Sequence, residues 1–318
     1  MLATPLNKSE DHSSACVDDL AKVQAPSPSK TYILPNKCKL AYDEYGSKSG
    51  YPVFYFHDNG SSRLECFFYH RSARKQGFRL IAVDRPGIGC SDYYPLQSCA
   101  QFCEDLLLLA DELDLTEFGI MSLGAGGVFA LSMAHQFPAR VKFQLCLAGV
   151  PGHVFNERVS NSTISNCIGS VAPALIRILV GLKQNFFPEN PDKALQRLEN
   201  NLSYTDRKVL ANPRIRKILA MDQNEVLRNG CRGLAQDTAH CFRKLEFSLK
   251  QISVPMEIWQ GSADRMSQRS DCEYLASNLP QANYNRVANR GHFFFIQNMD
   301  EVFSKLRPSQ NVRLERAA

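Results

Sequence analysis

Residues 117–141 read EFGIMSLGAGGVFALSMAHQFPARV and predict a strand, a tight turn and a helix in direct succession. Phe118–Met121 is a short apolar run typical of a buried strand, and a group of small residues follows from Ser122 to Gly127. Apolar residues then recur at helical spacing until Pro138 ends the pattern. The sequence therefore predicts a sharp strand-to-helix turn built from small residues.

This order of elements resembles the nucleophile elbow of the α/β-hydrolase superfamily, in particular its cap-bearing members of the AB hydrolase-1 type. Such members read G-x-S-x-G-G-x-x-A-L-x-x-A and then P-x-R-V. The matching positions here are Gly126, Gly127, Ala130, Leu131, Ala134, Pro138, Arg140 and Val141. In this register Gly124 stands where the family has its nucleophilic serine. Glycine tolerates the strained backbone of such a turn, so we expect a positive φ at residue 124 and no nucleophile there.

A second register would make Ser122 the nucleophile, two residues earlier. It would place Ile120 where close packing favours a small residue, and it would break the match of the following glycines. The register with Gly124 is preferred, and Ser122 is then a packing residue at the end of the strand.

The segment His57–Glu65, HDNGSSRLE, resembles the oxyanion-hole loop of the family, H-G-x-P-G-S-R-L-E. The resemblance implies that the backbone N–H groups of Asn59 and Ala125 form the hole, with His57 and Asp58 lining the site. Asp58 stands where the family has glycine. Its carboxylate either lies beside the hole, where it opposes a developing negative charge, or caps the following turn and faces solvent.

Two more motifs match the family beyond the middle of the chain. A predicted strand at Val254–Gln260 leads into GSAD, which puts Asp264 at the position of the family's catalytic acid. The segment NRGHFFF puts His292 on the loop of its catalytic histidine. The order of residue 124, then the acid, then the histidine is the order of α/β-hydrolases.

The resemblance implies the α/β class and the α/β-hydrolase fold, a mostly parallel, doubly wound sheet with an inserted helical cap. We expect a flexible N-terminal arm at residues 1–30, the core at 31–151 and 251–318, and the cap at 152–250. Within this cap, the apolar stretch Ile168–Leu182 either lines the roof of the pocket or is buried inside the cap.

Local patterns predict four further elements. Thr31–Leu34 and Cys38–Tyr45 predict an antiparallel hairpin. Ser98–Leu115 has the apolar spacing of an amphipathic helix. Val141–Val150 predicts a buried strand, and the last helix is predicted to begin at Met299.

Composition narrows the class of protein. The chain has 318 residues, of which 44% are hydrophobic and 22% charged, as expected of a globular protein with a sizeable core. Its net charge of +5 is spread along the chain, so we expect no nucleic-acid partner. The eleven cysteines show no CxxC spacing, and the polar first residues lack a secretory pattern, so we expect reduced thiols in a cytoplasmic protein. No metal site, cofactor or integral membrane segment is predicted, and the oligomeric state is not predicted.

Three functions remain open. In the first, His292 and Asp264 act as a general base on a small apolar organic molecule, in isomerase, cyclase or hydrolase-like chemistry that would suit secondary metabolism. In the second, the chain is an inactive pseudo-hydrolase that binds a small ligand or a protein partner. In the third, a substitute such as Ser122 serves as the nucleophile of a hydrolase. Ordinary serine-esterase activity is not expected, because residue 124 carries no hydroxyl group.

Overall fold

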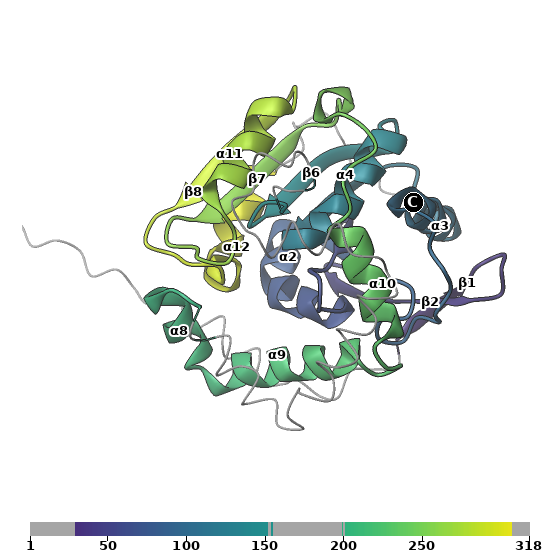
Figure 1. The fold of residues 1–318 in the computed structure, drawn as a ribbon, viewed down its shortest axis with the longest axis horizontal. Helices are drawn as coiled ribbons and strands as arrows, with labels where there is room; N and C mark the ends of the chain where they lie inside the picture. The colour runs from purple at the N-terminus through teal and green to yellow at the C-terminus, as the bar shows by residue number, and fades with distance from the viewer. Residues whose placement is uncertain (1–28, 152–153, 155–198, 200, 307–318) are drawn as a thin grey trace, which may run out of the picture.

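The computed structural model describes residues 29–151, 154, 199 and 201–306, and these residues form one mixed sheet covered by helices on both faces (Figure 1). The sheet has eight strands in the order β1-β2-β4-β3-β5-β6-β7-β8. The first two strands run antiparallel to their neighbours, and the other pairs are parallel. The strands are β1 Lys30–Ile33, β2 Lys39–Gly46, β3 Tyr51–Phe56, β4 Phe78–Val83, β5 Phe118–Leu123, β6 Val141–Leu147, β7 Met256–Gly261 and β8 Ala282–Val287.

The helices fall into two layers and a third group that lies beyond the sheet. Helices α3, α4 and α11 contribute to the core on one face of the sheet, and α2 and α12 contribute to the core on the other. In Figure 1, α9 runs across the side of the molecule away from α11, between α8 and α10. The helices are α2 His70–Gln76, α3 Cys99–Glu112, α4 Gly127–Gln136, α8 Tyr204–Leu210, α9 Pro213–Val226, α10 Arg232–Cys241, α11 Arg269–Asn278 and α12 Phe294–Lys305, with short 3-10 helices η2 Arg63–Tyr69, η3 Gly124–Gly126 and η5 Leu249–Gln251.

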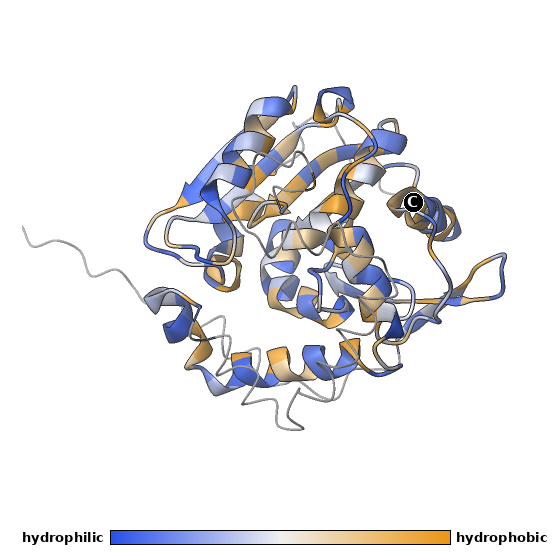
Figure 2. Ribbon diagram, viewed as in Figure 1, coloured by the Kyte–Doolittle hydropathy of each residue, from blue (hydrophilic) through white to orange (hydrophobic). Residues whose placement is uncertain are grey.

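The central strands are apolar on both sides because helices cover both faces of the sheet. In β3, Phe54 and Phe56 belong to the core shared with α3 and α4, while Val53 and Tyr55 belong to the core shared with α2 and α12. Alternate residues of a strand point to opposite faces, so a strand in the middle layer needs apolar residues at every position. The edge strand β8 is mostly hydrophilic, as Figure 2 shows, which suits a strand with one unpaired side.

The predicted fold class is confirmed, and most predicted elements lie within a few residues of the observed ones. The hairpin is β1 and β2 in antiparallel pairing, and the amphipathic helix is α3, capped by the Ser98 side chain. The strand predicted at Val141–Val150 ends earlier, at Leu147, because Ala148 and Gly149 both have positive φ and turn the chain.

The predicted start of the last helix is wrong. Helix α12 begins at Phe294 and not at Met299. Its N-cap, Phe293, has no side chain that could cap the helix, so the sequence carries no start signal there. The N–H group of Phe293 donates instead to Oδ1 of Asp206, at 2.8 Å, in the first turn of α8.

The predicted domain boundaries stay predictions. Most of the predicted N-terminal arm and the stretch Ile168–Leu182 lie outside the described residues. Within the predicted cap, residues 201–250 form α8, α9 and α10, and the core resumes at β7.

A close approach of two glycines joins α10 to the loop after β4. Gly233 lies in the first turn of α10, and a Cβ atom added to it would stand 2.1 Å from the carbonyl oxygen of Gly87. No side chain fits between these two backbones, so glycine is required at position 233. This contact accounts for the second glycine of the segment GCRG, residues 230–233.

We expect Gly233→Ala to lower the free energy of unfolding by about 3 kcal/mol, the upper end of the usual cost of overpacking, because the added methyl group meets rigid backbone. Gly230→Ala is a matched control, since Gly230 has φ 79° and no atom lies within 4 Å of an added Cβ. Its cost is the left-handed strain alone, about 1 kcal/mol. Urea unfolding measures both, and equal losses would show that α10 moves freely against the β4 loop.

Candidate active site

The turn between β5 and α4 has the backbone that the sequence predicts. Gly124 has φ 49°, in the left-handed region that side-chain-bearing residues rarely adopt, so the predicted positive φ is confirmed. The residue is buried and begins the short helix η3, which leads directly into α4. The turn therefore presents residue 124 at the end of a central strand, a position where a side chain would point into the site.

The carboxylate of Asp58 occupies the space that a side chain at position 124 would fill. A Cβ atom added to Gly124 would lie 2.6 Å from Oδ1, 2.8 Å from Cγ and 2.9 Å from Oδ2 of Asp58. All three distances are shorter than van der Waals contact. Asp58 can adopt this position only because residue 124 is glycine.

The N–H groups of Asn59 and Ala125, which the sequence predicts as an oxyanion hole, both point at one oxygen atom of Asp58. Oδ1 accepts a hydrogen bond from Ala125 N at 2.8 Å and one from Asn59 N at 2.7 Å. The two donors are thus brought together, and a carboxylate oxygen of the protein itself lies between them. The alternative in which Asp58 faces solvent is wrong, because these two N–H groups hold its carboxylate inside the site.

The predicted acid and histidine also meet. Nδ1 of His292 lies 3.1 Å from Oδ2 of Asp264, and both side chains are almost completely buried. Oδ1 of Asp264 accepts the N–H groups of Met266 at 2.8 Å and Ser267 at 3.1 Å, which fixes the carboxylate. Because Nδ1 carries the proton donated to Asp264, Nε2 is the ring nitrogen left for chemistry.

His292 and Asp58 influence each other through their charges. Burial disfavours the charged form of His292, but the hydrogen bond and charge of Asp264, followed by the charge of Asp58, outweigh burial and raise its pKa. Burial also raises the pKa of Asp58, which the positive charge of His292 and the hydrogen bond from Ala125 N–H lower only in part. The imidazole of His292 thus lies in the field of several carboxylates, of which Asp264 and Asp58 have the larger effects.

His57 is a buried residue that supports the backbone of this site. Burial, followed by the charge of Arg85, lowers the pKa of His57 to about 3, so its ring is neutral near pH 7. Its Nδ1 donates to the carbonyl oxygen of Asp58 at 2.9 Å, and Nε2 accepts the N–H group of Arg85 at 3.4 Å. His57 therefore supports the backbone that carries Asp58.

Ser122 is a buried residue of β5, next to Cys146 of β6 in the strand register. Among the described residues, its hydroxyl group makes no hydrogen bond to His292. This position agrees with the packing role that the preferred register gives to Ser122.

The sequence did not predict the role of every site residue. Glu65 lies beneath Asp58, where Oε2 accepts Tyr55 Oη at 2.6 Å and Asp58 N at 3.0 Å. Burial, then the charge of Asp222, raises the pKa of Glu65 to about 8. Only the match of Ser62–Glu65 to the family loop could have pointed to this residue, because a buried carboxyl group has no periodic pattern of its own.

Helix α8 holds the loop that carries His292. Besides accepting Phe293 N–H, the Asp206 carboxylate packs against Gly291, since a Cβ added there would lie 2.0 Å from Asp206 Oδ2. The charge of Asp206 is one of the causes that raise the pKa of His292. No motif in the sequence indicates this contact, which joins residues far apart in the chain.

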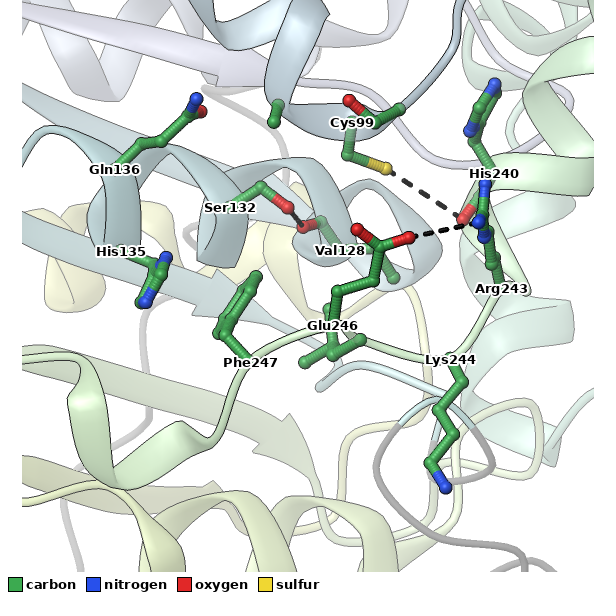
Figure 3. Close-up of a pocket in the computed structure, with 13 residues that line it drawn as sticks. Cys99, Val128, Ser132, His135, Gln136, His240, Arg243, Lys244, Glu246 and Phe247 are labelled. Carbon is green, nitrogen blue, oxygen red and sulfur yellow. Dashed lines mark hydrogen bonds and ion pairs between the residues drawn. The ribbon is translucent and has the colours of Figure 1, made fainter.

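A separate small cavity shares no lining residue with the site (Figure 3). Its volume is about 80 Å³, and it lies between α4, represented by Val128 and Ser132, and the segment after α10 that contains Phe247. Nδ1 of His240, in its wall, has no hydrogen-bond partner among the described residues. The cavity is much smaller than the pockets of roughly 300–1,000 Å³ that hold organic ligands.

The described part of the chain has neither a cluster of metal-ligating side chains nor a helix that could span a membrane. No group of three or more His, Cys, Asp or Glu side chains in residues 29–151 and 201–306 is placed to hold a metal ion. No helix in these ranges is both long and apolar enough to cross a bilayer.

Solved structures from several bacteria resemble this fold closely. A hydrolase from Pseudomonas aeruginosa PA01 superposes with a TM-score of 0.67 and 17% identity, covering 90% of this chain and 100% of that one. An esterase from Exiguobacterium antarcticum gives 0.67 with 17% identity over 87% and 97%, and a bromoperoxidase from Bacillus anthracis gives 0.66 with 16% identity over 87% and 98%. The chain has the α/β-hydrolase fold. At these identities the likeness shows the fold and not the reaction.

Sequence comparison adds a local match. An uncharacterized hydrolase of Bacillus subtilis, YcgS, is 29% identical over 92 residues, which are 29% of this chain and 32% of that protein. The match thus spans about a third of that relative. No protein-family model matches the chain.

We expect Gly124→Ser to lower the free energy of unfolding by about 1–3 kcal/mol, because it strains a left-handed residue and drives Asp58 away from the two N–H groups. The double change Gly124→Ser with Asp58→Gly should recover part of this loss and hydrolyse p-nitrophenyl acetate faster than either single variant. A vacant donor of this kind stabilises an oxyanion by about 2.7–4 kcal/mol. Equal ester hydrolysis by the single and double variants would show that the Asp58 carboxylate does not obstruct the N–H pair.

We expect Glu65 to make the stability of the fold depend on pH. Its pKa of about 8 in the folded protein exceeds the ordinary 4.5, so the folded state binds the proton more tightly than the unfolded state. The free energy of unfolding should therefore fall as pH rises from about 4.5 to about 8. Glu65→Gln keeps an acceptor for Tyr55 and removes the titration, so its stability relative to wild type should increase between pH 5 and pH 8.5. The same difference in free energy of unfolding between the two proteins at both pH values, measured by urea unfolding, would contradict this.

Proposed function

We propose that the chain is a hydrolase that acts on a small organic molecule at the site above Gly124, with His292 and Asp264 as its acid–base pair. The observation that carries the proposal is the buried Nδ1–Oδ2 hydrogen bond of 3.1 Å between these residues. It fixes one tautomer of the ring and leaves Nε2 to exchange a proton with water or substrate.

Ordinary serine-esterase chemistry is not part of this proposal. Residue 124 has no hydroxyl group, and the N–H pair that would bind a substrate oxyanion already holds Asp58 Oδ1. Ser122 is buried within β5, so its position gives little support to a role as a substitute nucleophile.

We make three further proposals, which concern the cap, the location of the protein and the class of its ligand. We propose that residues 152–250 form a helical cap that selects the substrate. We further propose that the protein is cytoplasmic and that its ligand is a small apolar molecule rather than nucleic acid. Helices α8, α9 and α10 support the proposal of a cap, because they lie between the core strands β6 and β7 in the chain.

A second candidate is a pseudo-hydrolase that binds a ligand without converting it. One observation favours it, namely that the Asp58 carboxylate fills the N–H pair from within the protein. In that case His292 would serve only as a partner of Asp264.

Replacement of His292 distinguishes the two candidates. If His292 transfers a proton, His292→Ala should reduce turnover of the native substrate by about 10²–10⁴-fold and leave binding and folding nearly unchanged. Small-molecule profiles would be compared between cells that lack the chain and cells that carry wild type, His292→Ala or His135→Ala. His135 is a matched control because it lies on α4, where it stacks on Phe247 away from the dyad. Full restoration of the wild-type profile by His292→Ala would leave only the binding function.

A further inference from the structure

The two oxygen atoms of the Asp58 carboxylate are held unequally. Oδ1 accepts two backbone N–H groups, at 2.7 and 2.8 Å, whereas Oδ2 accepts no hydrogen bond from any described residue. Both atoms lie within 2.9 Å of the point where a Cβ of residue 124 would stand. A carboxylate oxygen thus stands at the position from which an elbow nucleophile would act, although it comes from a different loop.

We infer that Asp58 is the nucleophile of this site and that its Oδ2 attacks a saturated carbon atom bearing a leaving group. The inference rests on the proposed role of His292 as the base of the reaction. It assigns a substrate class, molecules with an electrophilic sp³ carbon such as a strained cyclic ether or an alkyl halide.

The backbone of Asp58 is fixed as a nucleophile requires. Its N–H group donates to Glu65 Oε2 at 3.0 Å, and its carbonyl oxygen accepts His57 Nδ1 at 2.9 Å and Arg85 Nη2 at 3.1 Å. Together with the two bonds to Oδ1, these contacts leave the side chain little freedom. Such positioning lowers the entropic part of the barrier to attack.

The same contacts decide between attack at saturated carbon and attack at a carbonyl group. Attack on a substrate carbonyl would create an oxyanion that needs the Asn59 and Ala125 N–H groups, which are already bonded to Asp58. Carboxylate attack there would also yield a reactive anhydride. Displacement at saturated carbon creates no such oxyanion, so it needs no vacant N–H pair in its first step.

The first step forms one bond and breaks one. Oδ2 donates an electron pair to the carbon, the carbon–leaving-group bond breaks, and an alkyl ester of Asp58 remains with Oδ1 as its carbonyl oxygen. A halide departs as the anion, whereas the oxygen of a strained ring departs as an alkoxide and takes the proton of the His292 imidazolium.

Water completes the reaction. Nε2 of neutral His292 removes a proton from water, the resulting hydroxide adds to Cγ of the ester, and the negative charge on Oδ1 is stabilised by the Asn59 and Ala125 N–H groups. Collapse expels an alkoxide, which takes the proton from His292, and leaves Asp58 as a carboxylic acid that contains one oxygen of the water. The carboxylic proton then passes to His292, which restores the imidazolium for a ring-opening cycle, or to solvent when the leaving group was a halide. Formation of the ester removes the negative charge of Asp58, which is one of the causes that raise the pKa of His292. The pKa of His292 therefore falls, and the neutral ring is available as a base in this step.

Isotope labelling tests the inference. The full chain, in excess over the probe, would be incubated in H₂¹⁸O with either styrene oxide or 1-bromohexane. It would then be digested for mass spectrometry. We expect ¹⁸O in the peptide that contains Asp58. His292→Gln should accumulate an adduct of the mass of the ring-opened or alkyl probe on Asp58, because the ester forms but water is not activated.

Two variants serve as controls in the same experiment. Asp58→Asn should lose both the adduct and the label, while its thermal unfolding reports whether it is folded. Asp105→Asn should keep both, since Asp105 is a half-buried carboxyl group bound by Tyr94 Oη on another part of the chain. The probe that forms the adduct distinguishes a cyclic ether from a halide substrate.

The possible failures are distinguishable. In single-turnover samples, ¹⁸O in the alcohol product without ¹⁸O in Asp58 would show that Asp58 is not the nucleophile. His292 would then act as a base on the water that attacks the substrate directly. No adduct on Asp58 of His292→Gln with either probe, at concentrations that alkylate free thiols of the same protein, would overturn the inference as well. Activity on the native substrate that is lost in His292→Ala but kept in Asp58→Asn would overturn it independently of the probes.

Discussion

Arg85 is the buried cation on which the site depends. Its guanidinium group donates to the carbonyl oxygens of His57 and Asp58 and forms an ion pair with Asp237 of α10. A buried guanidinium is tolerated only when its charge is neutralised and its N–H groups are bonded, and these partners meet both conditions. The end of β4, the loop after β3 and α10 therefore hold one another in place, and the orientation of Asp58 follows from that arrangement.

A second arginine repeats this design beside the first. Arg63 bonds to Asp84 at 2.6 Å and to Glu225 of α9 at 2.6 Å, and both pairs are buried. Asp222, one turn earlier on α9, accepts the N–H group of Ser62 at 3.0 Å. Buried charged and polar groups thus join α9 and α10 to the sheet side of the molecule in addition to the apolar packing of Ile215 and Ile218, and such directed contacts fix their register more strictly than apolar packing alone.

The sequence was sufficient for the parts of the site that depend on local pattern. The strand–turn–helix at Gly124 and the position of Asp264 could be predicted, because each follows a core strand whose apolar run is visible in the chain. His292 follows the hydrophilic edge strand β8, and only the match of its loop to the family motif pointed to it. The direction of the Asp58 carboxylate could not, since it depends on N–H groups of two separate loops and on the missing Cβ of residue 124. The contact of Asp206 with the His292 loop was equally hidden, as no local pattern links residues so far apart.

Gly124 and Asp58 are best understood as one structural feature. With a side chain at position 124, Oδ1 of Asp58 would stand 2.6 Å from its Cβ and would be forced out of the N–H pair. With glycine at position 58, the N–H groups of Asn59 and Ala125 would lose the acceptor that now lies between them. Glycine at position 124 makes room for the Asp58 carboxylate but does not by itself require a carboxylate at position 58. A carboxylate held by two N–H groups beside a buried histidine is costly to desolvate, and such strain is commonly kept where chemistry uses it.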